Sequence, residues 1–80
     1  QELDSYETQQ LLMGDMVDNY ERMLSAEERK FMLGESSLFL VNSRESKLID
    51  ATLKRNEIQN KFYSAKAKLF NSIGQAPQNL

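Results

Sequence analysis

Apolar side chains recur along the chain at alternating steps of three and four residues, which is the period of a coiled-coil helix. In the first half, the positions with this spacing hold Leu3, Tyr6, Gln10, Met13, Val17, Tyr20, Leu24, Glu27 and Phe31, of which only Gln10 and Glu27 are polar or charged. In the second half, they hold Val41, Arg44, Leu48, Ala51, Arg55, Ile58, Phe62, Ala65, Leu69 and Ser72. The pattern predicts one helix over about residues 2–32 and another over about residues 36–73, roughly 45 and 55 Å long.

Glycine and proline predict how these helices are joined and where they end. Gly34 can adopt the left-handed conformation that closes a helix, and Ser36 or Ser37 can cap the next one. We therefore expect an all-α fold, a long antiparallel two-helix hairpin with a turn over about residues 33–36. Gly74 and Pro77 predict the end of the second helix. We therefore expect residues 1–74 to form the hairpin and residues 75–80 to form a tail.

Gly14 interrupts the first helical pattern. Its simplest interpretation is a tolerated interior glycine, which costs about 1 kcal/mol relative to alanine. The alternative is a close backbone contact that leaves no room for a side chain. The sequence leaves both interpretations open.

A second apolar stripe runs along each predicted helix. The first helix carries Leu12, Met16, Met23 and Ala26; the second carries Ile49, Leu53, Tyr63, Ala67 and Phe70, with Asn56 and Asn60 filling the gap. One stripe packs against one partner, so two stripes require two neighbours. A lone hairpin of 80 residues cannot cover both. We expect the chain to associate with copies of itself, as a homo-oligomer, or with other parts of a longer protein.

Composition excludes several classes of function. The chain of 80 residues is 40% hydrophobic and 28% charged, with a net charge of -2, so it has no basic excess for nucleic acid. It contains no cysteine and no histidine, which excludes disulfides, thiolate metal sites and His-based catalytic triads. The longest apolar run, Leu38–Val41, is too short to cross a bilayer. Gln1 opens a polar, acidic stretch that does not read as a signal peptide.

Charge differs between the two halves. Residues 1–35 carry nine acids and three bases, whereas residues 36–80 carry three acids and seven bases. The simpler interpretation is complementary solvated faces on an antiparallel hairpin. Alternatively, Arg44, Arg55 and Lys61 contact an acidic partner. Arg44 and Arg55 lie on the apolar stripe, where they can set the register, reach carboxylates of a neighbouring helix or cover apolar surface with their stems.

Candidate catalytic and metal-binding groups are weak. Asp15 with Asp18, and Glu21 with Glu28, lie close together on helical faces but form no compact multi-ligand loop. Ser36 and Ser37 with Lys47 do not form a credible nucleophile and base, because a thin helical chain offers no obvious pocket. Tyr6, Tyr20 and Tyr63 lie on packing stripes and are expected in the core. We therefore expect no enzyme activity, no metal and no cofactor.

The segment around Gly34 resembles the outer-membrane efflux proteins of the TolC type. The stretch Lys30–Glu45 places an aromatic residue three positions before a glycine, then small polar residues and an apolar run, ahead of a long helix. The resemblance continues in Lys47-Leu48-Ile49, Ala51, Phe62-Tyr63-Ser64-Ala65 and Leu69-Phe70-Asn71-Ser72-Ile73-Gly74. It covers roughly residues 28–74, and its ordered set of elements is more specific than any one of them.

The resemblance implies a helical hairpin from the C-terminal portion of a trimeric efflux channel of the Gram-negative outer membrane. This segment would lie in the periplasm as part of an α-helical tunnel, and export of small molecules through it would be passive. A periplasmic adaptor protein and an inner-membrane pump would be its partners. Gly34 would lie at the tip where the adaptor docks, and the docking site would comprise Phe31, Leu33, Gly34, Glu35 and Ser36.

The sequence departs from the family at the expected gating positions. Some members of the family carry gating aspartates a few residues after the glycine, but here those places hold Leu40 and Ser43 or their neighbours, so no gating acid is expected. The alternative function is a free-standing coiled-coil module for protein–protein interaction. Both functions require the same hairpin, so the pattern of apolar positions does not separate them.

Overall fold

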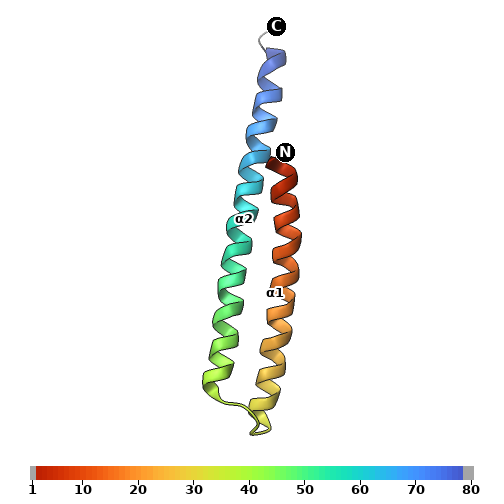
Figure 1. Ribbon diagram of the computed structural model, residues 1–80. Helices are drawn as coiled ribbons and strands as arrows, with labels where there is room; N and C mark the ends of the chain where they lie inside the picture. Colours follow the sequence, from red (N-terminus) through yellow and green to blue (C-terminus); the bar gives the residue numbers. More distant parts are fainter. Residues whose placement is uncertain (1, 79–80) are drawn as a thin grey trace.

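The computed structural model describes residues 2–78 of the backbone and the side chains of residues 4–73. Within this range the chain forms two helices and no strand: α1 (Glu2–Met32) and α2 (Leu38–Gln78). The helices lie side by side and antiparallel, joined by one short turn (Figure 1). The molecule measures 71 × 15 × 14 Å. The predicted all-α hairpin is confirmed.

Both ends of the second helix differ from the expectation. α2 begins at Leu38 rather than at residue 36, because Ser37 caps it, as described below. It also continues to Gln78, five residues beyond the predicted end at 73. Gly74 raises the free energy of a helix by about 1 kcal/mol without ending it, and Gln75 and Ala76 beside it are good helix formers. The predicted tail of residues 75–80 is therefore helical as far as 78, and residues 79–80 lie outside the described part.

The stripe predicted first forms the contact between α1 and α2. The buried apolar residues are Val17, Val41, Ala51 and Ile58, which all lie on it. Tyr6, Tyr20, Leu24 and Leu48 are half-buried at further positions of the same stripe. Tyr63 was expected in the core but is 55% exposed, because it lies on the second stripe, which the hairpin leaves uncovered.

The second stripes are exposed. On α1 the outer stripe consists of Leu12, Met16, Asn19, Met23 and Ala26, of which only Ala26 is half-buried. On α2 it consists of Ile49, Leu53, Asn56, Asn60, Tyr63, Ala67 and Phe70, which are all exposed. The hairpin thus buries the contact between α1 and α2, called the seam below, and leaves one apolar outer stripe exposed on each helix, as the sequence predicted.

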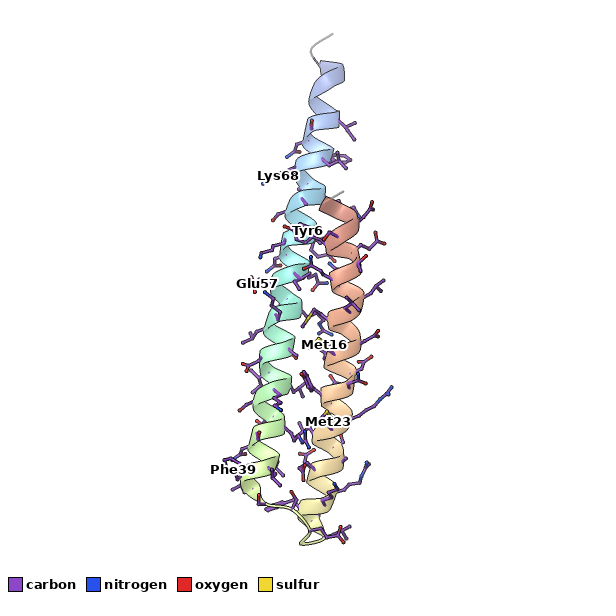
Figure 2. All side chains as sticks on the ribbon, in the orientation of Figure 1. Tyr6, Met16, Met23, Phe39, Glu57 and Lys68 are labelled. Carbon is purple, nitrogen blue, oxygen red and sulfur yellow. The ribbon has the colours of Figure 1, made fainter. Side chains whose placement is uncertain are left out.

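The two outer stripes lie on opposite sides of the hairpin. Met16 of the α1 stripe borders a groove of about 360 Å³ between the helices, together with Lys47 and Lys54 of α2. In Figure 2, Met16 and Met23 point from α1 on the side that faces α2. Lys54 and Asn56 are two residues apart and therefore about 200° apart around α2. Asn56 and the rest of the α2 stripe consequently face away from the groove that Met16 borders.

Gly14 lies in an open part of α1. A methyl group added at its Cα would meet no atom within 4 Å outside its own helix turn. Within the hairpin this agrees with a tolerated interior glycine and not with a close backbone contact between α1 and α2.

Candidate functional site

The end of α1 and the turn that follows it contain the residues that the resemblance implied for docking. The backbone N–H of Gly34 donates to the carbonyl of Phe31 at 3.0 Å, and that of Glu35 donates to the carbonyl of Lys30 at 2.8 Å. Gly34 has a φ of 77°, in the left-handed region. This combination is a Schellman motif, which satisfies the last carbonyl groups of α1 and requires a residue that tolerates positive φ.

Ser37 starts α2 on the other side of the turn. Its Oγ accepts a hydrogen bond from the backbone N–H of Leu40 at 3.2 Å, and its carbonyl accepts one from Val41 at 3.1 Å. These are the two bonds of a helix N-cap. The sequence offered Ser36 and Ser37 as caps, and the structure assigns this role to Ser37.

Ser36 instead joins a polar cluster beneath the turn. Glu27 of α1 is only 6% exposed, and both of its carboxylate oxygens have partners. The hydroxyl of Ser36 donates to Oε2, and Nε of Arg44 donates to Oε1 at 3.2 Å. The Ser36 hydrogen bond, followed by the Arg44 hydrogen bond, lowers the pKa of Glu27. The cluster connects α1, the turn and α2, so it fixes the turn relative to both helices.

The structure shows what the three basic residues singled out in the sequence contact. Arg44 reaches a carboxylate of the neighbouring helix within the hairpin, one of the roles that its stripe position allowed. Lys61 pairs with Glu57 of its own helix at 3.2 Å, and Arg55 lies beside Gln10 and Gln59. The sequence could have pointed to the pair, because Glu27 and Arg44 are charged exceptions on two facing apolar stripes.

The surface of the tip is apolar. Of the predicted docking residues, Phe31, Leu33, Gly34 and Glu35 are exposed, whereas Ser36 is half-buried against Glu27. Sequence reasoning did not include four further exposed apolar residues at this end: Met32, Leu38, Phe39 and Leu40. Phe39 is 77% exposed and projects from the outer edge of α2 (Figure 2). The signal for Leu38, Phe39 and Leu40 was the apolar run that follows the two serines, whereas Met32 lies between Phe31 and Leu33 at the end of α1.

The described residues offer little for other chemistry. No group of three or more metal-ligating side chains occurs among them, and Asp15, Asp18, Glu21 and Glu28 do not converge on one point. A hollow of about 500 Å³ lies open on the outside of α1 and is lined by Asp18, Glu21, Arg22, Ser25 and Arg29. Among the described residues, neither α1 nor α2 has an apolar stretch that could span a bilayer.

Comparisons with known proteins add no assignment. No family model, curated protein or solved structure matches the chain. The features of the hairpin that bear on its function are therefore the tip and the two outer stripes.

Proposed function

We propose that the chain is a hairpin of the periplasmic α-helical tunnel in a TolC-type outer-membrane efflux protein. In this proposal the full-length protein is a trimer in the Gram-negative outer membrane. Its tunnel conducts small molecules passively, while an inner-membrane pump supplies the energy. A periplasmic adaptor protein docks at the tip around Gly34.

The observation that carries this proposal is the position of the two outer stripes. In a wall one helix thick, each helix contacts a neighbour on either side. α1 and α2 cover one side of each other through Val17, Ala51 and Ile58, and each then presents a further apolar stripe of its own. A hairpin that acts alone would expose these stripes to water at a cost, whereas a wall buries them.

The tip supports the docking part of the proposal. Phe31, Leu33 and Phe39 place apolar side chains on the exposed end of the hairpin, and the Schellman motif holds the backbone beneath them. The Glu27 cluster fixes the turn before a partner arrives, so little conformational entropy is lost on binding. A rigid, exposed apolar end is typical of a docking site.

The test uses the full-length protein in the membrane. Gly34→Val should strain the left-handed turn by roughly 1–2 kcal/mol and place a side chain in the path of the adaptor. We expect trimer assembly to persist while efflux and adaptor cross-linking fall. Glu35→Lys is the matched variant, because it changes the charge of the tip without straining the backbone.

Two outcomes of this experiment differ in meaning. Normal efflux and cross-linking in Gly34→Val would contradict docking at this turn. A parent protein that forms no outer-membrane trimer would contradict the channel itself and favour the free-standing coiled-coil module.

A further inference from the structure

The outer stripes of α1 and α2 have matching patterns. On α1 the order is Leu12, Met16, Asn19, Met23, Ala26; on α2, read in the reverse direction, it is Tyr63, Asn60, Asn56, Leu53, Ile49. When the two are aligned antiparallel, Leu12 faces Tyr63, Asn19 faces Asn56 and Ala26 faces Ile49. The steps between these three pairs are seven residues on both helices, which is two turns of a coiled coil.

We infer that the α2 outer stripe of one hairpin packs against the α1 outer stripe of a second copy, in the register that sets Asn19 opposite Asn56. Four of the five facing positions then bring at least one apolar side chain to the contact, and the central position brings two amides together. Two facing amides can donate to and accept from each other within an apolar contact. Every register that separates them is disfavoured, because it leaves both amides without this partner.

Charge favours this occupant over a contact between like helices. Residues 1–35 carry six more acids than bases, and residues 36–80 carry four more bases than acids. A contact of α1 with α1 would bring two acidic helices together, whereas a contact of α1 with α2 joins helices of opposite net charge. Lys47 and Lys54 face away from the α2 stripe, so this preference acts between whole helices rather than through ion pairs in the contact.

The direction of the second copy follows from the same alignment. Because α1 and α2 of one hairpin are antiparallel, an antiparallel contact between copies keeps both turns at the same end. The shared end agrees with the tunnel wall and rests on the proposed function. The pairing of the two stripes rests only on the exposed residues of this hairpin.

The contact is head-to-tail, since it joins different surfaces of the two copies. Each added copy presents a free α1 stripe and a free α2 stripe, so the assembly grows sideways unless it closes into a ring. The isolated chain should therefore form a concentration-dependent series of oligomers rather than one compact dimer.

Cysteine cross-linking tests the inference directly, because the chain contains no cysteine of its own. Asn19→Cys and Asn56→Cys are made separately in the 80-residue chain and then mixed under mild oxidation. We expect the mixed disulfide to exceed either self-disulfide at least roughly fivefold, about 1 kcal/mol of preference. Ser25→Cys, on the face of α1 that lines the hollow with Asp18 and Glu21, is the matched control and should not cross-link to Asn56→Cys.

A second pair of mixtures tests the direction. Ala26→Cys should cross-link to Ile49→Cys when both turns lie at the same end. Leu12→Cys should cross-link to Ile49→Cys when the turns lie at opposite ends, which would overturn the direction and leave the pairing of stripes intact.

Two further outcomes would overturn the pairing itself. A dominant Asn19→Cys self-disulfide would show α1 packed on α1, and a monomer at every concentration by sedimentation would exclude a second copy as the occupant. Neither outcome depends on efflux, so failure here is distinguishable from failure of the proposed channel.

Discussion

The tip of the hairpin and its open end are built differently. At the tip, Glu27, Ser36 and Arg44 satisfy one another, and the backbone closes α1 and opens α2 with capping hydrogen bonds. At the open end, α2 continues past the start of α1, as Figure 1 shows, and Leu69, Phe70 and Ile73 are exposed. The tip is held by contacts within the hairpin, whereas these apolar side chains at the open end are left exposed.

Buried polar groups show the same difference. Both oxygens of Glu27 have partners near the tip, whereas Nε2 of Gln10, in the open half, is buried without a partner among the described residues. A buried polar group without a partner costs free energy, so the open half is the less optimised half of the seam. Removing the unpartnered amide of the open half should therefore stabilise the hairpin, whereas removing a hydrogen-bond partner at the tip should destabilise it.

The largest effect is expected in the seam. Ile58 is 5% exposed, and Ile58→Ala should lower the free energy of unfolding by about 2–5 kcal/mol. Ile49→Ala is the matched control, because Ile49 is 50% exposed on the outer stripe and should change the stability of the hairpin by about 0.5 kcal/mol or less. Urea unfolding followed by circular dichroism at one low concentration measures both. Equal losses would mean that the outer stripe is already covered under those conditions.

The sequence could predict this seam but not its polar details. The steps of three and four residues placed Val17, Val41, Ala51 and Ile58 correctly, because a helical period maps directly onto a face. The same period could not distinguish a buried Glu27 from a solvated one, since that depends on whether Arg44 and Ser36 reach it. Nor could it choose between two adjacent serines as caps, because the two differ only in backbone conformation.

The end of α2 shows a further limit of sequence reasoning. Gly74 and Pro77 are helix-ending residues on average, yet α2 continues to Gln78. Propensities act as small increments of free energy, and a glycine costs too little to end a helix on its own. In the candidate site, the sequence identified the exposed Phe31, Leu33, Gly34 and Glu35. The docking set that the resemblance implied left out Met32, Leu38, Phe39 and Leu40, because the sequence alone does not show which apolar residues of this stretch are exposed.

Gly14 in α1 and Gly34 in the turn extend the comparison to the backbone of the two regions. Neither Gly14 nor Gly34 has an atom within 4 Å of an added methyl group, but only Gly34 has a positive φ. Gly34→Ala should therefore destabilise the hairpin by roughly 1–2 kcal/mol through backbone strain alone. Gly14→Ala should stabilise it by about 1 kcal/mol through helix propensity. Thermal unfolding of both variants checks the signs, and the same sign in both would contradict the open surroundings of Gly14.

Replacing Gln10, in the open half of the hairpin, should increase the stability of the fold. Gln10→Leu should raise the free energy of unfolding by about 1 kcal/mol, because it replaces a buried amide whose nitrogen lacks a partner with an apolar side chain. Gln9→Leu is the matched control: the Gln9 side chain donates to Ser5 on the exposed side of the helix. Chemical denaturation distinguishes the two. A loss of stability in Gln10→Leu would show that the amide is satisfied in solution.

Capping at the start of α2 should give an effect of similar size with the opposite sign. Ser37→Ala removes the acceptor for the Leu40 N–H and should cost about 1 kcal/mol. Ser46→Ala, at an exposed position inside α2, should be neutral or slightly stabilising. Circular dichroism and hydrogen exchange at Leu40 report the loss. An unchanged Ser37→Ala variant would mean that water replaces the cap at no cost.

The smallest effect is a pH dependence confined to the tip. The Ser36 and Arg44 hydrogen bonds favour the ionised form of Glu27 and lower its pKa in the folded hairpin. The unfolded chain therefore binds the proton more readily, so the contribution of Glu27 is present above its ordinary pKa and is lost as the pH falls through the lowered value. Glu27→Gln should reduce the difference in stability between neutral and acidic pH.

Glu57→Gln is the matched control for this effect. The pKa of Glu57 is also lowered, mainly by Lys61, but its side chain is 51% exposed and solvent screens the pair. We expect a smaller change in the pH profile of Glu57→Gln than in that of Glu27→Gln, measured by urea unfolding between neutral pH and about pH 3. Identical profiles in the two variants would mean that the cluster beneath the turn is as solvated as the surface pair, and the tip would then lose its distinction from the open end.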